Sequence, residues 1–84
     1  MSISATAPDA RVQNVSVSAA YLEVTLRDGR KISAPLNWFP RLFNATSSQK
    51  QRWEISGAGY GIHWPDIDED LSVEGLLRGQ RAPA

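Results

Sequence analysis

The strongest constraint in the sequence is a turn signal, Asp28-Gly29, between two stretches that alternate apolar and polar residues, 21–27 and 30–36. Such alternation is typical of β-strands with one buried face. A two-residue loop would set apolar side chains opposite polar ones, whereas a three-residue loop keeps one face apolar by pairing Val24 with Ile32. We therefore predict a hairpin with a three-residue loop, whose glycine takes the left-handed position of a type I turn with a bulge.

Strand patterns also occur on both sides of this hairpin. Residues 12–18 alternate and predict a first strand, while the turn chemistry of Ser18-Ala19-Ala20 leaves the geometry of its loop open. Residues 53–56 and 62–64 predict a short C-terminal hairpin, which Pro65 ends because proline cannot donate a hydrogen bond to a sheet.

Short helices are predicted in three places. The range Asn37–Phe43 suits a helix capped by its first residue, because Pro40 then lies in the first turn. Residues 46–49 form a capping box for a second helix that reaches residue 51 or 52. Ser72 can cap a last helix over 73–77.

Together these elements predict an α+β fold. A small antiparallel sheet, made of an N-terminal three-stranded meander plus a short C-terminal hairpin, packs with two or three short helices. The length of 84 residues supports one core. We expect a single domain over 11–79, a flexible leader over 1–10 and a flexible tail over 80–84.

Composition excludes several classes of protein. The chain has no cysteine, which rules out disulfides, thiolate zinc sites and a cysteine nucleophile. Its net charge is zero, which argues against general affinity for nucleic acid. Residues 1–52 nevertheless carry seven basic and three acidic residues, and residues 53–84 carry two basic and six acidic ones. Without a signal peptide or a long apolar run, we expect a cytoplasmic protein and no membrane contact.

One glycine-rich segment and one acidic segment could suggest ligand binding. Gly57, Gly59 and Gly61 do not fit a nucleotide loop, because no helix can follow them. Carboxylates at 66, 68, 69 and 70 could hold a hard cation, but the spacing does not match an EF-hand loop. The simpler interpretation is an acidic loop before the last helix.

Histidine and the aromatic residues supply the remaining candidates. His63 could act as a general base beside an aspartate, although no nucleophile is evident. Strand alternation points Trp64 inward and His63 outward, and we expect Asp66, Asp68 and Glu69 to face solvent as well. Trp38 next to Phe39 and near Arg41 has the composition of a protein-binding surface.

Two sequence motifs resemble a bacterial family known as domain of unknown function 2442. One is Trp-Phe-Pro-Arg at Trp38–Arg41, within 24–42; the other is His-Trp-Pro followed by Asp-Glu-Asp, within 59–77. The resemblance extends over 12–79 and implies a small α+β fold with an N-terminal antiparallel sheet. Some relatives carry an added helix-turn-helix domain, which this chain does not show, so DNA binding by itself is not expected. Members resemble one component of a toxin–antitoxin pair, which implies a second small protein as partner.

These observations lead to a protein-binding accessory or antitoxin-like module, with another small protein or a second copy of the chain as partner. The candidate contact residues are Trp38, Arg41, His63, Trp64, Asp66, Asp68 and Glu69. One alternative is a small metal-dependent enzyme that uses the carboxylates of 66–70 with His63 as base. Another is weak nucleic-acid binding through Arg27, Arg30 and Lys31. We assign no catalytic residue, metal ligand or cofactor, and we favour a protein that is not an enzyme.

Overall fold

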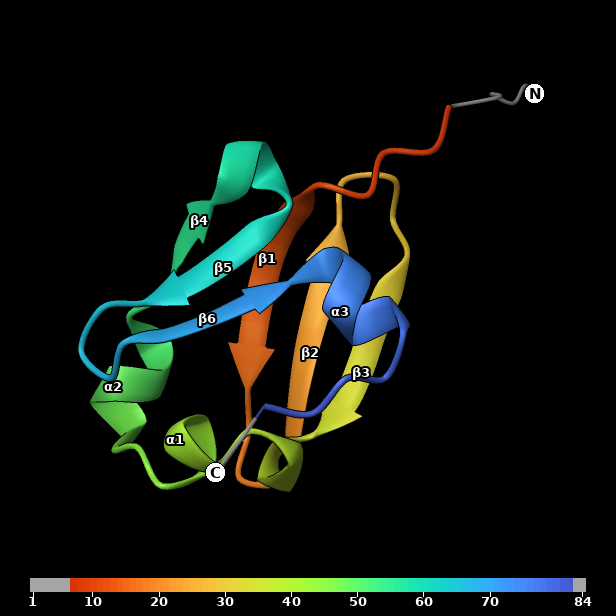
Figure 1. Ribbon diagram of the computed structural model, residues 1–84. Coiled ribbons are helices and arrows are strands. Elements are labelled where there is room, and N and C mark those ends of the chain that lie inside the picture. The colour runs from red at the N-terminus through yellow and green to blue at the C-terminus, as the bar shows by residue number, and fades with distance from the viewer. Residues whose placement is uncertain (1–6, 83–84) are drawn as a thin grey trace.

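The computed structural model describes residues 7–82, which form two three-stranded antiparallel sheets and short helices (Figure 1). The first sheet has the order β1-β2-β3, with β1 at Val12–Val17, β2 at Tyr21–Leu26 and β3 at Lys31–Pro35. The α+β class and the N-terminal meander are therefore as predicted.

The hairpin between β2 and β3 has the predicted three-residue loop. Val24 lies opposite Ile32 in the register, and the Leu26 amide donates to the Arg30 carbonyl across the turn at 2.8 Å. Gly29 has a φ of 95°, in the region that favours glycine. The loop between β1 and β2, left open by the sequence, is closed by Ser18, whose amide donates to the Tyr21 carbonyl at 2.9 Å.

The turn makes Gly29→Ala a direct test of this geometry. Apart from its two chain neighbours, no heavy atom of the described residues lies within 4 Å of the position that its Cβ would take, so the cost is backbone strain alone. We expect alanine to lower the free energy of unfolding by about 1 kcal/mol, and Gly29→Val to lower it further, because β-branched side chains fit a positive φ poorly. Thermal unfolding measures the change, and equal melting temperatures for wild type and Gly29→Val would contradict the turn.

The predicted helix over Asn37–Phe43 is wrong in one respect, because the structure divides it. A 3₁₀ turn, η1, covers Leu36–Trp38, and the helix α1 covers Pro40–Phe43. Phe39 lies between them with a φ of −125°, outside the helical region. A proline disfavours helical conformation in the residue before it, so Pro40 begins α1 and prevents the longer helix. Asn37 accordingly does not cap α1.

The second predicted helix, α2, covers Ser47–Gln51. Its capping box is confirmed: the Thr46 hydroxyl accepts from the Gln49 amide at 3.2 Å, and the Thr46 amide donates to the Gln49 side chain at 2.9 Å. Both bonds satisfy amide groups that would otherwise lack a partner at the start of the helix.

The second sheet contains one strand more than the predicted hairpin. β4 (Glu54–Ser56), the 3₁₀ turn η2 (Gly57–Gly59) and β5 (Gly61–Trp64) are followed by β6 at Glu69–Ser72, in the order β4-β5-β6. The acidic residues were expected on a loop, but only 65–68 form a turn. Glu69 and Asp70 belong to β6 because their backbone pairs with β5.

The core lies where the two sheets face each other. β5 and β6 cross over the first sheet in Figure 1, and the helix α3 (Val73–Leu77) continues from β6 toward β3. Ser72 caps α3 as predicted, since its hydroxyl accepts from the Gly75 amide at 2.9 Å. Apolar side chains from all three strands of the first sheet, η1, α1, β5 and α3 form one buried cluster, and Phe39, between η1 and α1, is with Trp64 its largest member.

The described parts of the predicted leader and tail are hydrogen-bonded to the domain. The Asp28 amide donates to the Asp9 carbonyl at 3.2 Å, and the Ala82 amide donates to the Trp38 carbonyl at 3.1 Å. Residues 1–6 and 83–84 lie outside the described residues, and the flexibility of both ends stays a prediction. No helix within 7–82 is long and apolar enough to cross a membrane.

Candidate functional site

The two sequence motifs lie next to each other in the fold. Arg41, on α1, donates from its guanidinium to the Asp68 carbonyl in the turn before β6, at 2.7 Å. Phe39 and Glu69 line one pocket. The segments at Trp38–Arg41 and at 63–70 therefore form one region of the surface, a relation that the sequence left open.

The outward orientation predicted for Glu69 is wrong. Its residue exposure is 8%, because it lies opposite the fully buried Trp64 in the β5–β6 register and so shares the inward face of the sheet. Oε1 accepts from the Asp70 amide at 3.2 Å. Oε2 is buried and has no hydrogen-bond partner among the described residues. Glu69 is thus an inward carboxylate rather than part of an exposed acidic cluster.

Glu69 faces a pocket of about 220 Å³ between β6, α3 and the chain at 80–82. Phe39 and Leu76 form an apolar part of the pocket wall, while Gln80 and Arg81 line it from the C-terminal segment. The Gln80 amide donates to the Gly75 carbonyl at 2.9 Å, which holds this segment against α3. The pocket therefore combines a buried carboxylate with an apolar wall.

Trp38 is half-buried, and its ring is covered by Arg81 rather than by Arg41. The guanidinium carbon of Arg81 lies 4.6 Å from the ring centroid, which is a cation–π contact. Arg41 reaches toward Asp68 instead.

Trp64, another of the predicted contact residues, is completely buried, and its indole N–H donates to the Lys50 carbonyl at 3.1 Å. Trp64 therefore supports the site from inside the core.

The carboxylates between 66 and 70 point in different directions. Asp66 pairs with Arg52 at 3.4 Å, and Asp70 pairs across the strands with His63, whose Nδ1 lies 2.8 Å from the carboxylate oxygen. Glu69 turns inward. Within 7–82 no group of three or more histidine, aspartate and glutamate side chains could hold a metal ion. The His63–Asp70 pair could orient the imidazole as a base.

Neutralising the two exposed turn carboxylates should leave the fold intact. We expect Asp66→Asn combined with Asp68→Asn to change the free energy of unfolding by less than about 1 kcal/mol, because an exposed ion pair contributes little. Asp68 has a φ of 51°, a conformation that asparagine tolerates as well as aspartate does. Urea unfolding measures the effect; a loss of several kcal/mol would show that the Asp66–Arg52 pair holds the turn in place.

A second hollow lies beside α3. This apolar groove of about 400 Å³ is lined by Ala10, Tyr60, Val73 and Leu77, with Ser72 and Glu74 as polar members. Tyr60 and Leu77 expose 51% and 57% of their surface. Neither residue is among the contact residues predicted from the sequence. The pair Leu76-Leu77 was a usable signal, because two adjacent leucines on a short helix cannot both face the core.

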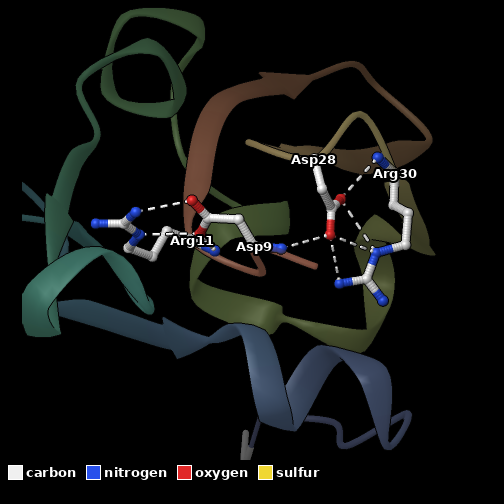
Figure 2. A network of polar contacts seen from close by, with 4 residues as sticks. All are labelled: Asp9, Arg11, Asp28 and Arg30. Carbon is white, nitrogen blue, oxygen red and sulfur yellow. Dashed lines mark hydrogen bonds and ion pairs between the residues drawn. The ribbon is translucent and has the colours of Figure 1, made fainter. Parts of the chain in front are cut away.

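A polar network fastens residues 9–11 to the β2–β3 turn, as Figure 2 shows. Asp9 accepts two bonds from the Arg11 guanidinium, at 2.9 and 2.7 Å, and Arg30 pairs with Asp28 at 2.8 Å. The Asp9 amide joins the two pairs by donating to the Asp28 carboxylate at 2.9 Å. The hydrogen bond from the Arg11 side chain lowers the pKa of Asp9 to about 2, and that from Arg30 lowers the pKa of Asp28 to about 2.

The same network bears on the nucleic-acid alternative. At the predicted basic hairpin tip, Arg30 is paired with Asp28, and Lys31 lies 3.9 Å from Glu23. Two of the three bases therefore have acidic neighbours, and the tip is not a strongly basic patch. Few phosphate contacts remain for it to make.

Acid should weaken the fold through this network. Because the pKa values of Asp9 and Asp28 in the folded chain lie below the ordinary 3.8, their charged forms stabilise the fold above about pH 4. This stabilisation is lost as the pH falls from about 4 through 2. We expect Asp9→Asn with Asp28→Asn to flatten the decline in unfolding free energy over that range, measured by urea unfolding at a series of pH values. An unchanged slope would contradict the two lowered pKa values.

Comparison with known proteins identifies relatives of the whole domain. A solved structure of a protein of unknown function from Rhodospirillum rubrum is 33% identical, with a TM-score of 0.73, over 87% of this chain and 90% of that one. An uncharacterized protein from Chromobacterium violaceum is 26% identical, with a TM-score of 0.74, over 88% of this chain and 70% of that one. No curated protein matches the chain. The sequence model of the family described as "Protein of unknown function (DUF2442)" matches residues 9–82, so the chain belongs to the DUF2442 family.

Proposed function

We propose that this domain is a protein-binding module whose contact surface is the apolar groove beside α3. The observation that carries the proposal is the exposure of Tyr60 and Leu77, which line one groove with the buried Val73. Adjacent exposed apolar side chains with a polar rim are typical of surfaces that bind other proteins. Glu74 and Ser72 supply such a rim.

The groove fits an apolar side chain of a partner more readily than a substrate with reactive polar groups. It holds one carboxylate, from Glu74, which also pairs with Arg78 at 2.9 Å. We expect the partner to be another small protein. An antitoxin-like arrangement, which the family resemblance implies, would be one form of such binding. The metal-enzyme alternative has less support, because the carboxylates at 66–70 diverge.

The test compares two pairs of exposed apolar residues. Tyr60→Ser with Leu77→Ser removes apolar surface from the groove, and Phe43→Ser with Tyr21→Ser removes a similar amount of exposed surface elsewhere. The tagged domain is co-expressed with small proteins encoded beside it, and co-purification is measured. We expect the wild type and the control variant to retain a partner that the groove variant loses. Equal retention by both variants would contradict the groove as contact surface.

A second copy of the chain is the competing occupant. Light scattering after size-exclusion chromatography distinguishes the cases, because a self-association through the groove disappears in the groove variant and persists in the control. A chain that stays monomeric and retains none of the co-expressed proteins would overturn the proposal.

A further inference from the structure

We propose that the free edge of β6 binds an extended, basic segment of another protein, which adds to the second sheet as a fourth strand. β6 stands last in the order β4-β5-β6, so within the described residues its side away from β5 is unpaired. An unpaired edge presents backbone N–H and C=O groups to which a further strand can bond. This surface differs from the apolar groove beside α3, and the proposal does not rest on the function of that groove.

The pairing of β6 with β5 determines which backbone groups face the free edge. The Val73 amide donates to the Tyr60 carbonyl at 2.9 Å, so these two residues form a hydrogen-bonded pair that continues the β5–β6 register. Hydrogen-bonded pairs alternate along an antiparallel ladder, which makes Leu71 and Ile62 the next such pair. The N–H and C=O groups of the intervening residues, 70 and 72, are therefore directed away from β5.

Two of these four groups already have partners. The Asp70 amide donates to Glu69 Oε1 at 3.2 Å. Ser72 is the N-cap of α3, and the carbonyl of an N-cap residue accepts the first hydrogen bond of its helix. The Asp70 carbonyl and the Ser72 amide, on either side of Leu71, remain free within residues 7–82. One residue of a strand parallel to β6 matches them, because its N–H donates to the carbonyl and its C=O accepts from the amide.

A hollow lies along this edge of β6. All four residues of β6 line the pocket of about 220 Å³, as does the segment 80–82. In Figure 1 the edge faces α1 and the C-terminal segment. The amides of Gln80 and Ala82 donate to α3 and η1, and among the described residues this segment does not pair with β6. Asp70, Ser72 and Gln80 are exposed, so the hollow opens to solvent, and its volume suits a short pairing.

Strand geometry defines the side chains of the added segment. Leu71 lies opposite the buried Ile62 and shares the inward face of the sheet, so a partner residue beside it also points inward. Phe39 and Leu76 line the pocket there and favour an apolar side chain. The neighbours of that residue point outward, beside Asp70, whose side chain is 68% exposed. The segment is therefore apolar at the central position and basic on both sides of it.

Charge argues against a second copy of the chain as the occupant. Two β6 strands that paired through their free edges would bring the carboxylates of Glu69 and Asp70 from both copies onto one short ladder. Like charges on paired strands are unfavourable, whereas a basic segment places an opposite charge beside Asp70.

The probe is the peptide acetyl-Thr-Lys-Val-Lys-Thr-amide, titrated into the full chain labelled for amide NMR. The matched control carries an N-methyl group on the valine, which keeps charge and side chains but removes the N–H that donates to the Asp70 carbonyl. We expect a saturable downfield shift of the Ser72 amide, which gains an acceptor. The control should bind about fivefold more weakly or worse, because the loss of one ordinary hydrogen bond changes an equilibrium by about that factor. Equal affinities, or no saturable shift with the first peptide, would overturn the proposal without requiring any variant to fold.

Two variants test the basic character of the segment. Asp70→Asn removes the exposed charge and should weaken binding of the peptide by about twofold to fivefold. Glu54→Gln is the control, since Glu54 lies opposite His63 and thus on the same outward face, but at the other edge of the sheet. Its affinity should match that of the wild type. Equal affinities for the wild type and Asp70→Asn would overturn the assignment of a basic partner.

Hydrogen exchange of the chain without peptide tests the other occupants. The Leu71 amide, bonded to β5, should be protected, and the Ser72 amide should exchange quickly. Light scattering gives the oligomeric state of the same sample. A protected Ser72 amide in a monomer would show that the chain itself covers the edge, and one in a dimer would show that a second copy does. Either result overturns the proposal.

Discussion

Trp64→Ala is expected to lower the free energy of unfolding by about 3–5 kcal/mol, which is a large share of the stability of a domain of this size. Trp64 is completely buried on β5, at the point where the second sheet faces the first. Its replacement leaves a cavity that the neighbouring strands cannot fully close. It also leaves the Lys50 carbonyl without the indole N–H that donates to it at 3.1 Å.

Two further variants separate these contributions. Trp64→Phe retains most of the buried ring but not the hydrogen bond, and we expect it to cost about 1–3 kcal/mol. Trp38→Ala removes a half-buried tryptophan whose ring contacts Arg81, and we expect a smaller loss than for Trp64→Ala. Urea unfolding followed by circular dichroism measures all three. A Trp64→Ala variant with an unchanged midpoint would contradict the placement of this residue in the core.

The first sheet could be predicted because the residues that determine its strands and turn are close together in the sequence. Apolar alternation on two adjacent stretches and a glycine at the required loop position together admit one register, with Val24 opposite Ile32. The capping box at Thr46 is equally local, since both of its bonds join residues three apart. Such features depend on neighbouring residues and not on the rest of the fold.

β6 could not be predicted from its own residues. Glu-Asp-Leu-Ser has weak strand propensity and places a glutamate at the inward position opposite Trp64. The segment becomes a strand because β5 provides a backbone edge for it, and this depends on tertiary packing. The orientation of Glu69 follows from that pairing, so one missed strand also explains the error at the candidate site.

The site itself combines residues from distant parts of the chain. The motif resemblance indicated Trp38–Arg41 and 63–70 separately, and the contact between Arg41 and the Asp68 carbonyl joins positions 27 residues apart. Arg81 lies in a segment whose composition predicted a flexible tail, and nothing in its local sequence indicates that it covers Trp38. The sequence could indicate which residues belong to the site, but not which of them contact each other in the fold.

α3 lies between the pocket that Glu69 lines and the apolar groove. Leu76 lines the Glu69 pocket, while Val73 and Leu77 line the apolar groove, although the helix spans only Val73–Leu77. This short helix therefore contributes apolar side chains to both hollows.

Gly59→Ala is expected to be the most damaging of the glycine substitutions, with a loss of about 2–4 kcal/mol in the free energy of unfolding. Gly59 has a φ of 100°, so a side chain there strains the backbone as at Gly29. Its Cβ would also lie 2.9 Å from Cγ and Cδ of Arg11 and 3.0 Å from Cβ. That part of the arginine is the base of the side chain, and moving it disturbs the pair that Arg11 forms with Asp9.

Gly29→Ala is the matched control, because its φ of 95° is similar and its surroundings are open. Subtracting its loss from that of Gly59→Ala isolates the steric conflict with Arg11. Arg11→Ala removes Cγ and Cδ but keeps Cβ, so we expect the double variant with Gly59→Ala to lose less stability than the sum of the single variants, measured by a double-mutant cycle. Equal losses at the two glycines, or strict additivity in the cycle, would show that Arg11 does not lie against Gly59.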